Sequence, residues 1–204
     1  MTPTKARNRA TALAASDTGA ALEAARCVGD PWFGCQALAW VARFAPDDQL
    51  DAIIDEAFEV GGQAADVYQI IGSAAWPLRA LVERGRVDRL GTTLPGPLAL
   101  ASRVEQLASR SEGLFLVYQA VFPAGRPWWL PVLNELAHAS HPALHWRQAR
   151  NLRDAVLMAA RPDPGFARDF CPSVRNDRAR RQIEAGLARS ESQSPRPFFW
   201  RGDG

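Results

Sequence analysis

Three histidines are the residues whose types and spacing most resemble a metal site. His138, His141 and His145 follow one another at intervals of three and four residues, and Glu135 lies just upstream. Zinc takes three or four ligands at about 2 Å, and histidines three or four residues apart on one helix can supply two of them. Pro142 interrupts the run, because proline disfavours a helix that continues through it. We therefore expect His138 to end one helix, His141 to cap the next, and no metal to bind.

Covalent chemistry finds little support in the sequence. It contains no GxSxG, HExxH, Walker or dinucleotide-binding glycine pattern. Cys27, Cys35 and Cys171 are scattered and form no CxxC pair, which favours helix-packing residues over a disulfide framework or a zinc site. Acid pairs such as Asp47 and Asp51 fall on the exposed face of a predicted helix, where nothing would shift the pKa of a carboxyl group. We expect a protein that is not an enzyme and has no cofactor.

Tryptophans are numerous, with seven in 204 residues. Most lie beside apolar positions of predicted helices, where packing between helices accounts for them. Two places could instead form stacking surfaces, because an arginine adjoins the indole ring: Trp146 beside Arg147, and the Trp128–Trp129 pair beside Arg126.

Charge is unevenly distributed although the formal net charge is only +2. The stretch between Arg43 and Arg79 contains acidic but no basic residues, whereas arginine dominates from Arg147 to Arg189. Solvated outer helix faces would explain this pattern. If the basic end binds a partner, an acidic protein or peptide is expected, and head-to-tail pairing of the two ends would give a homo-oligomer. The candidate contact residues are Arg147, Arg150, Arg178, Arg181 and Trp146.

Length and composition predict one globular domain. Hydrophobic residues make up 47% and charged residues 23% of the chain, near the averages for globular proteins. No apolar run approaches the roughly 20 residues that span a bilayer, and no apolar stretch follows the basic N-terminus as in a secretory signal. We expect a cytoplasmic protein with no membrane partner, a domain over residues 1–189 and a flexible polar and aromatic tail over residues 190–204.

Apolar residues recur at helical spacing through most of the chain. The stripe of Leu50, Ile53, Ile54 and Ala57 predicts a helix from Asp47 to Gly61, with an aspartate as its cap and Gly61 in the left-handed conformation past its end.

Two further patterns set helix boundaries. Asp30-Pro31 predicts another helix start, because aspartate caps and proline suits the first helical position. Pro77 should kink or end the helix around it, the run TTLPGP at 92–97 should be a loop, and DPG at 163–165 should be a turn.

Internal repetition indicates how these helices are organised. Similar helix starts recur at uneven spacings, most of them about the length of one helix pair: DPWFGCQALAWVA, QAADVYQIIGSAA, SEGLFLVYQAV, HPALHWRQARNL and NDRARRQIEAGLA. Over roughly residues 20–190 this pattern resembles HEAT and armadillo repeats as a class, while tetratricopeptide and ankyrin signatures are missing. The resemblance implies an all-α fold, a short α-solenoid or α-α superhelix of about five helix pairs.

Three functions agree with that architecture. The first is a non-catalytic scaffold that binds a protein or peptide. The second is a nucleic-acid-binding solenoid, since some HEAT-like proteins are DNA glycosylases that hold bases against tryptophans; the single lysine and small net charge argue against nucleic acid as the partner, because phosphate contacts dominate such binding. The third is a small-molecule pocket between helices, which only a structure can locate.

Overall fold

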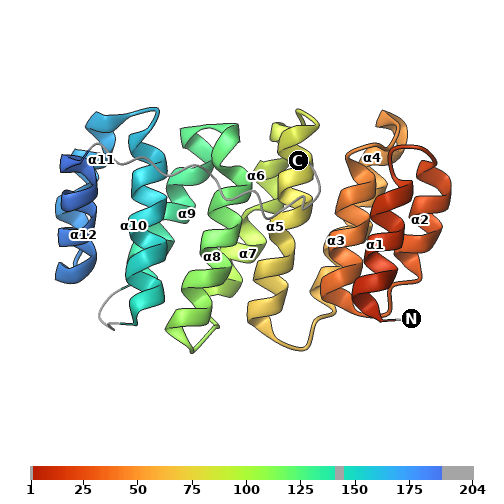
Figure 1. Ribbon diagram of the computed structural model, residues 1–204, viewed down its shortest axis with the longest axis horizontal. Helices are drawn as coiled ribbons and strands as arrows, with labels where there is room; N and C mark the ends of the chain where they lie inside the picture. The colour runs from red at the N-terminus through yellow and green to blue at the C-terminus, as the bar shows by residue number, and fades with distance from the viewer. Residues whose placement is uncertain (1, 141–144, 190–204) are drawn as a thin grey trace.

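The computed structural model describes residues 2–140 and 145–189, and every regular element in these stretches is a helix (Figure 1). None of the described helices is long and apolar enough to cross a membrane. The predicted tail at 190–204 and His141 lie outside the described residues. The α-helices are α1 (Pro3–Leu13), α2 (Thr18–Arg26), α3 (Pro31–Ala42), α4 (Asp47–Gly62), α5 (Val67–Glu83), α6 (Leu90–Thr93), α7 (Pro95–Ala101), α8 (Leu107–Val121), α9 (Arg126–Ala139), α10 (Trp146–Ala160), α11 (Pro164–Phe170) and α12 (Asp177–Ala188). Short 3-10 helices are η1 (Val87–Arg89), η2 (Phe122–Ala124) and η3 (Cys171–Ser173).

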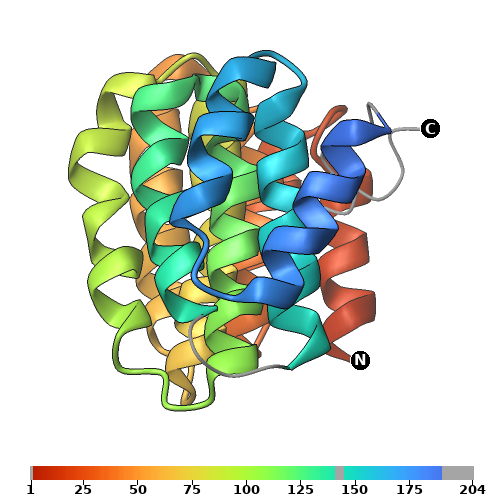
Figure 2. The ribbon, with the colours of Figure 1, turned by 90° about the vertical axis from the view of Figure 1, so that its left-hand side faces the viewer.

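The helices form two layers. A front layer consists of α1, α3, α5, α8, α10 and α12, in which each helix contacts the next, and α4, α6, α7, α9 and α11 lie behind it (Figures 1 and 2). All front-layer helices begin at the lower edge in Figure 1. Figure 2 looks along the row and shows α1 and α12 displaced to the same side relative to α5 and α8, so the front face is concave.

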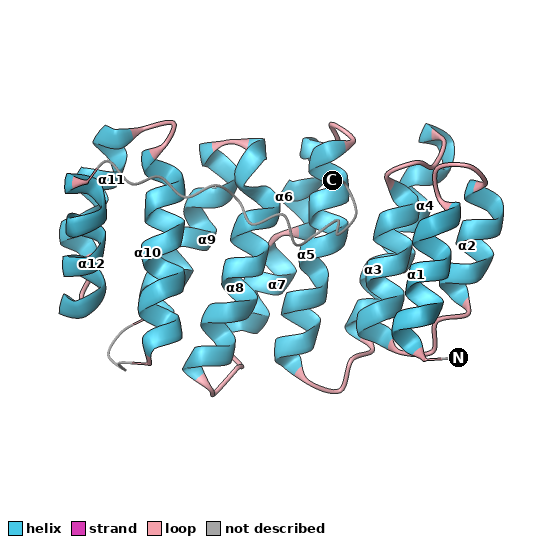
Figure 3. Cartoon of the chain, in the orientation of Figure 1, coloured by secondary structure: helices cyan, strands magenta, loops and turns pink. Residues whose placement is uncertain are grey.

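Loops join the two layers at their upper and lower edges (Figure 3). Four of the five segments that the sequence aligns as repeat starts lead into α3, α5, α10 and α12, and SEGLFLVYQAV lies within α8; all five helices belong to the front layer. The sequence pattern therefore picked out helices that lie in one layer.

Asp-Pro pairs begin helices in both layers. At the start of α3, the backbone N–H of Phe33 donates to Asp30 Oδ1 at 3.0 Å, which confirms the predicted cap. Asp163 accepts from the N–H of Phe166 at 2.9 Å in the same way. The predicted turn at 163–165 is therefore wrong, because Asp163 caps α11 and the following proline occupies its first turn, where its missing N–H is not needed.

The apolar stripe of α4 is buried as predicted, but both of its ends differ from the prediction. Pro46 precedes the helix without a side-chain cap, and the last turn continues through Gly61 to Gly62. Gly61 is needed for close approach rather than for a left-handed backbone: a Cβ there would lie 2.7 Å from Ser73 Oγ and 3.1 Å from Cys35 Sγ. This glycine lets α4 press against α3 and α5.

The helix around Pro77 does not end there, since α5 runs from Val67 to Glu83 without a break. Proline has no N–H to donate to the carbonyl four residues earlier, which belongs to Ser73. The Cys35 thiol lies 3.4 Å from that carbonyl oxygen and donates to it instead. A side chain from α3 thus replaces the hydrogen bond that the proline removes, and α5 tolerates it.

The run at 92–97 is mostly helical, contrary to the predicted loop. Its first residues belong to α6, and Pro95 begins α7. Proline at the first position of a helix loses no hydrogen bond, because the N–H there has no partner within the helix. A proline-containing run that is typical of a loop is therefore also compatible with a junction between two short helices.

Aromatic side chains fill the core between the two layers in the C-terminal half. The Trp129 ring packs edge-on against Tyr118 and Phe166, with centroids 6.1 and 5.2 Å apart. The hydroxyl of Tyr118 donates to the carbonyl of Ala155 at 2.8 Å, which ties α8 to α10 inside the core. Burial raises the pKa of this tyrosine.

Candidate partner-binding surface

Trp146 begins α10 and leaves 52% of its surface exposed. The guanidinium carbons of Arg147 and Arg150 lie 5.5 and 5.0 Å from the centre of its ring, and the His145 ring stacks on it at 5.9 Å. His145 caps the helix through Nδ1, which accepts from the N–H of Arg147 at 3.3 Å, while Gln148 accepts from the N–H of His145. The capping box thus fixes the helix start that carries an exposed indole with two cations over its ring.

Arg150 is held in place by side chains of two helices. Its Nη2 donates to Glu112 Oε1 on α8 at 2.8 Å and to Asn151 Oδ1 at 3.2 Å. The buried Asn151 in turn donates to Ser111 Oγ at 3.3 Å. Arg147 is exposed and forms no ion pair among the described residues, so it is the cation of this pair that remains free for a partner.

Tyr68 extends this surface from α10 towards the middle of the row. Burial is the main reason that its pKa is raised; Glu112 and Asp66 raise it further, whereas Arg147 lowers it. The Tyr68 side chain therefore lies within electrostatic range of the Glu112 and Arg147 side chains. Its ring also stacks on Trp32 of α3, with centroids 6.4 Å apart. We call this group the edge cluster; its members are Trp32, Tyr68, Glu112, Trp146, Arg147 and Arg150.

Sequence reasoning missed Tyr68, Glu112 and Trp32 as members. A signal for the aromatic members was present, because each falls in the first two residues of a front-layer helix: Trp32 in α3, Tyr68 in α5 and Trp146 in α10. Comparison of the predicted helix starts would have shown an aromatic residue in the first turn of each of these three helices.

Arg178 and Arg181 lie in the first two turns of α12, both exposed. No hydrogen bond, ion pair or ring contact among the described residues joins them to Trp146, Arg147 or Arg150, so the structure does not tie all five predicted residues into one cluster. It does place the two sets on adjacent helices, because α12 contacts α10 and both begin at the same edge (Figure 1). The positive ends of two helix dipoles add to the arginine charges there.

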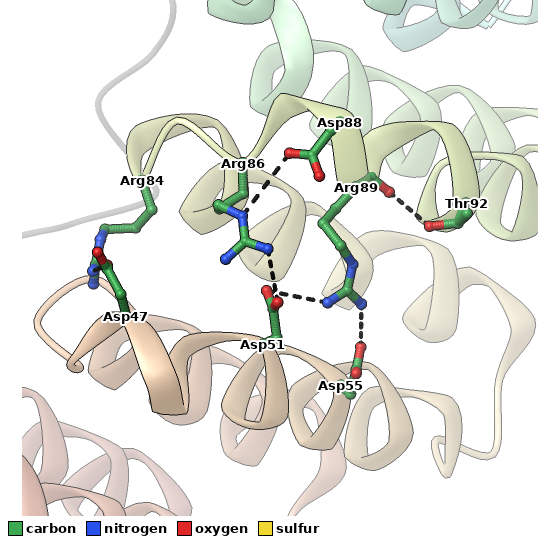
Figure 4. Close-up of polar contacts among 8 residues, drawn as sticks. All are labelled: Asp47, Asp51, Asp55, Arg84, Arg86, Asp88, Arg89 and Thr92. Carbon is green, nitrogen blue, oxygen red and sulfur yellow. Dashed lines mark hydrogen bonds and ion pairs between the residues drawn. The ribbon is translucent and has the colours of Figure 1, made fainter.

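The acidic stretch is engaged within the chain (Figure 4). Its carboxylates on α4 pair with arginines that follow α5. Arg89 bridges two of them, with Nη1 3.1 Å from Asp51 Oδ1 and Nη2 2.5 Å from Asp55 Oδ1. The other pairs are Arg84 with Asp47, and Arg86 with Asp51 and Asp88.

Arg84 also donates to the carbonyls of Ala42 and Ala45, at 2.8 and 2.7 Å, and so closes the end of α3. These arginines hold α4 against the segment between α5 and α6. Head-to-tail pairing of two chains through the acidic end would have to compete with these internal pairs.

The two described histidines, His138 and His145, lie at the ends of different helices. His138 is exposed in the last turn of α9, where the sequence placed it, whereas the cap of α10 is His145. Over residues 2–140 and 145–189, no group of three or more histidine, cysteine, aspartate or glutamate side chains could hold a metal ion.

The second candidate stacking surface, the Trp128–Trp129 pair beside Arg126, is not formed in the structure. Trp129 is buried in the core. Arg126 pairs with Asp163 at 3.6 Å and lies over the ring of Phe166, 4.5 Å from its centre. Trp146 is therefore the only one of the predicted stacking tryptophans that the described structure leaves largely exposed.

Comparison with protein-family models, curated proteins and solved structures gives no match for this chain.

Proposed function

We propose that the chain is a short HEAT-like α-solenoid that acts as a non-catalytic scaffold and binds an acidic protein or peptide segment. The binding surface is the edge at which α10 and α12 begin. The observation that carries this proposal is Trp146, an exposed indole at a capped helix start with the guanidinium groups of Arg147 and Arg150 over its ring. The two-layer arrangement, with the predicted repeat starts all in the front layer, supports the solenoid.

The chemistry of this edge favours an acidic segment with an apolar or aromatic side chain. An exposed tryptophan supplies a large rigid contact area, and arginine binds carboxylates through two parallel hydrogen bonds. Arg147, Arg178 and Arg181 form no ion pair among the described residues, so their charges are available. A partner with regularly spaced acidic residues could reach from α10 to α12.

The test is a selection of peptides from a random display library on the full chain, followed by affinity measurement of the best binders. Acidic peptides should be enriched, and their affinity should fall with added salt. In Arg147→Ala/Arg178→Ala, affinity should fall about tenfold or more, which corresponds to about 1.4 kcal/mol.

The matched control is Arg9→Ala, which removes an exposed arginine of α1, at the opposite end of the row of helices from α10 and α12 (Figure 1). It should bind as the unaltered chain does. Selection of neutral or basic peptides, or equal loss of affinity in the control, would refute the proposal.

A nucleic-acid scaffold is the alternative, and Trp146 is the observation that favours it, because exposed indoles beside arginines also stack on bases. Duplex and single-stranded DNA are therefore included as competitors in the same assay. Displacement of the acidic peptide by DNA at physiological salt would indicate that the surface binds nucleic acid, and a glycosylase assay would follow.

A further inference from the structure

A cavity of about 330 Å³, partly open to solvent, lies between α4, α5 and α7 and contains none of the edge-cluster residues. It forms where the rear layer consists of the short helices α6 and α7. Its walls are mostly apolar and include Phe58 of α4, Ile70 of α5 and Leu100 of α7. The volume falls within the range of about 300–1,000 Å³ that is usual for small-molecule sites.

The polar groups that line the cavity already have partners inside the protein. Ser73 Oγ donates to the carbonyl of Ile70 at 3.1 Å, and the Cys35 thiol donates to the carbonyl of Ser73. The hydroxyl of Thr93 donates to the carbonyl of Arg89 at 2.8 Å. Asp55, the acidic residue of the lining, binds Arg89. A charged ligand would therefore lose its hydration without gaining a free partner, whereas an apolar ligand would lose nothing.

Two exposed glycines also line the cavity. A Cβ at Gly62 of α4 or Gly96 of α7 would meet no atom within 4 Å. An apolar cavity of about 150 Å³ accommodates benzene, so this one has room for a molecule about twice that size.

We propose that this cavity is a binding site for a neutral, predominantly apolar small molecule, of about the size of two or three aromatic rings or a medium-length hydrocarbon chain. This site is independent of the peptide surface. Although α3 and α5 contribute residues to both places, none of the residues that line the cavity belongs to the edge cluster.

The experiment titrates the full chain with N-phenyl-1-naphthylamine, a neutral aromatic dye whose fluorescence rises in apolar surroundings. We expect saturable binding of one dye per chain, and at least tenfold weaker binding of an anionic sulfonated analogue. Gly96→Phe, which puts a ring into the space, should weaken dye binding at least tenfold.

Gly29→Phe is the matched control, because a Cβ at Gly29 also meets no atom within 4 Å but lies outside the cavity. It should leave dye affinity unchanged. Circular dichroism and thermal unfolding verify that each variant folds, and Gly62→Leu blocks the opposite wall if Gly96→Phe does not fold. Absence of saturable binding, equal binding by the blocked variants, or preference for the anionic dye would overturn the proposal.

Discussion

Two adjacent glycines at the end of α4 should respond to alanine with opposite signs. At Gly61 a Cβ would lie 2.7 Å from Ser73 Oγ and 3.1 Å from Cys35 Sγ, both in packed surroundings. Overpacking of this kind costs about 1–3 kcal/mol, against a gain of up to about 1 kcal/mol from better helix propensity. Gly61→Ala should therefore lower the free energy of unfolding by about 1–2 kcal/mol and the melting temperature by about 2–8 °C.

Gly62→Ala is the matched control, because it gains the same propensity with no atom within 4 Å of the new methyl group. It should raise the free energy of unfolding by up to about 1 kcal/mol. Urea unfolding followed by circular dichroism measures both values. Adding Ser73→Ala to Gly61→Ala removes the closest contact and should recover about 0.5–1 kcal/mol beyond additivity. If Gly61→Ala proves as stable as Gly62→Ala, the close approach of α4 to α3 and α5 is wrong.

Two predictions follow from buried ionisable groups. Burial raises the pKa of Cys35 to about 12, so only about one Cys35 thiol in ten thousand is ionised at pH 8. Treatment with iodoacetamide followed by mass spectrometry should find the exposed Cys27 alkylated and Cys35 unmodified until the chain unfolds. Similar labelling of both cysteines would contradict the burial of Cys35. Tyr118→Phe should lower the free energy of unfolding by about 1 kcal/mol at pH 7, because it loses the hydrogen bond to α10. Because folding raises the pKa of Tyr118, its contribution is fully present below the unfolded-state pKa of about 10 and is lost as pH rises above it. Urea unfolding at pH 8 and 11 should therefore show a smaller alkaline loss in Tyr118→Phe than in the unaltered chain, and an equal loss would refute the assignment.

The sequence by itself determined the helical class and much of the helix order. The spacing of apolar residues fixes which face of α4 is buried, and Asp30-Pro31 fixes where α3 starts, because both depend on interactions within a few residues. The repeat alignment also identified helices that share the front layer. It placed Trp146, Arg147 and Arg150 at one helix start, since neighbours in sequence stay neighbours on a helix.

Only the tertiary structure decided what crosses between helices. Pro77 reads locally as a break, yet α5 continues because a thiol from α3 satisfies the carbonyl that the proline leaves free. The sequence predicts that the acidic stretch is a solvent-exposed surface, yet arginines that follow α5, such as Arg89, form ion pairs with its carboxylates. Tyr68 joins Glu112 and Arg147 only because three front-layer helices begin at one edge. Such contacts depend on how helices far apart in sequence are placed in space, and residue spacing along a single helix carries no information about that placement.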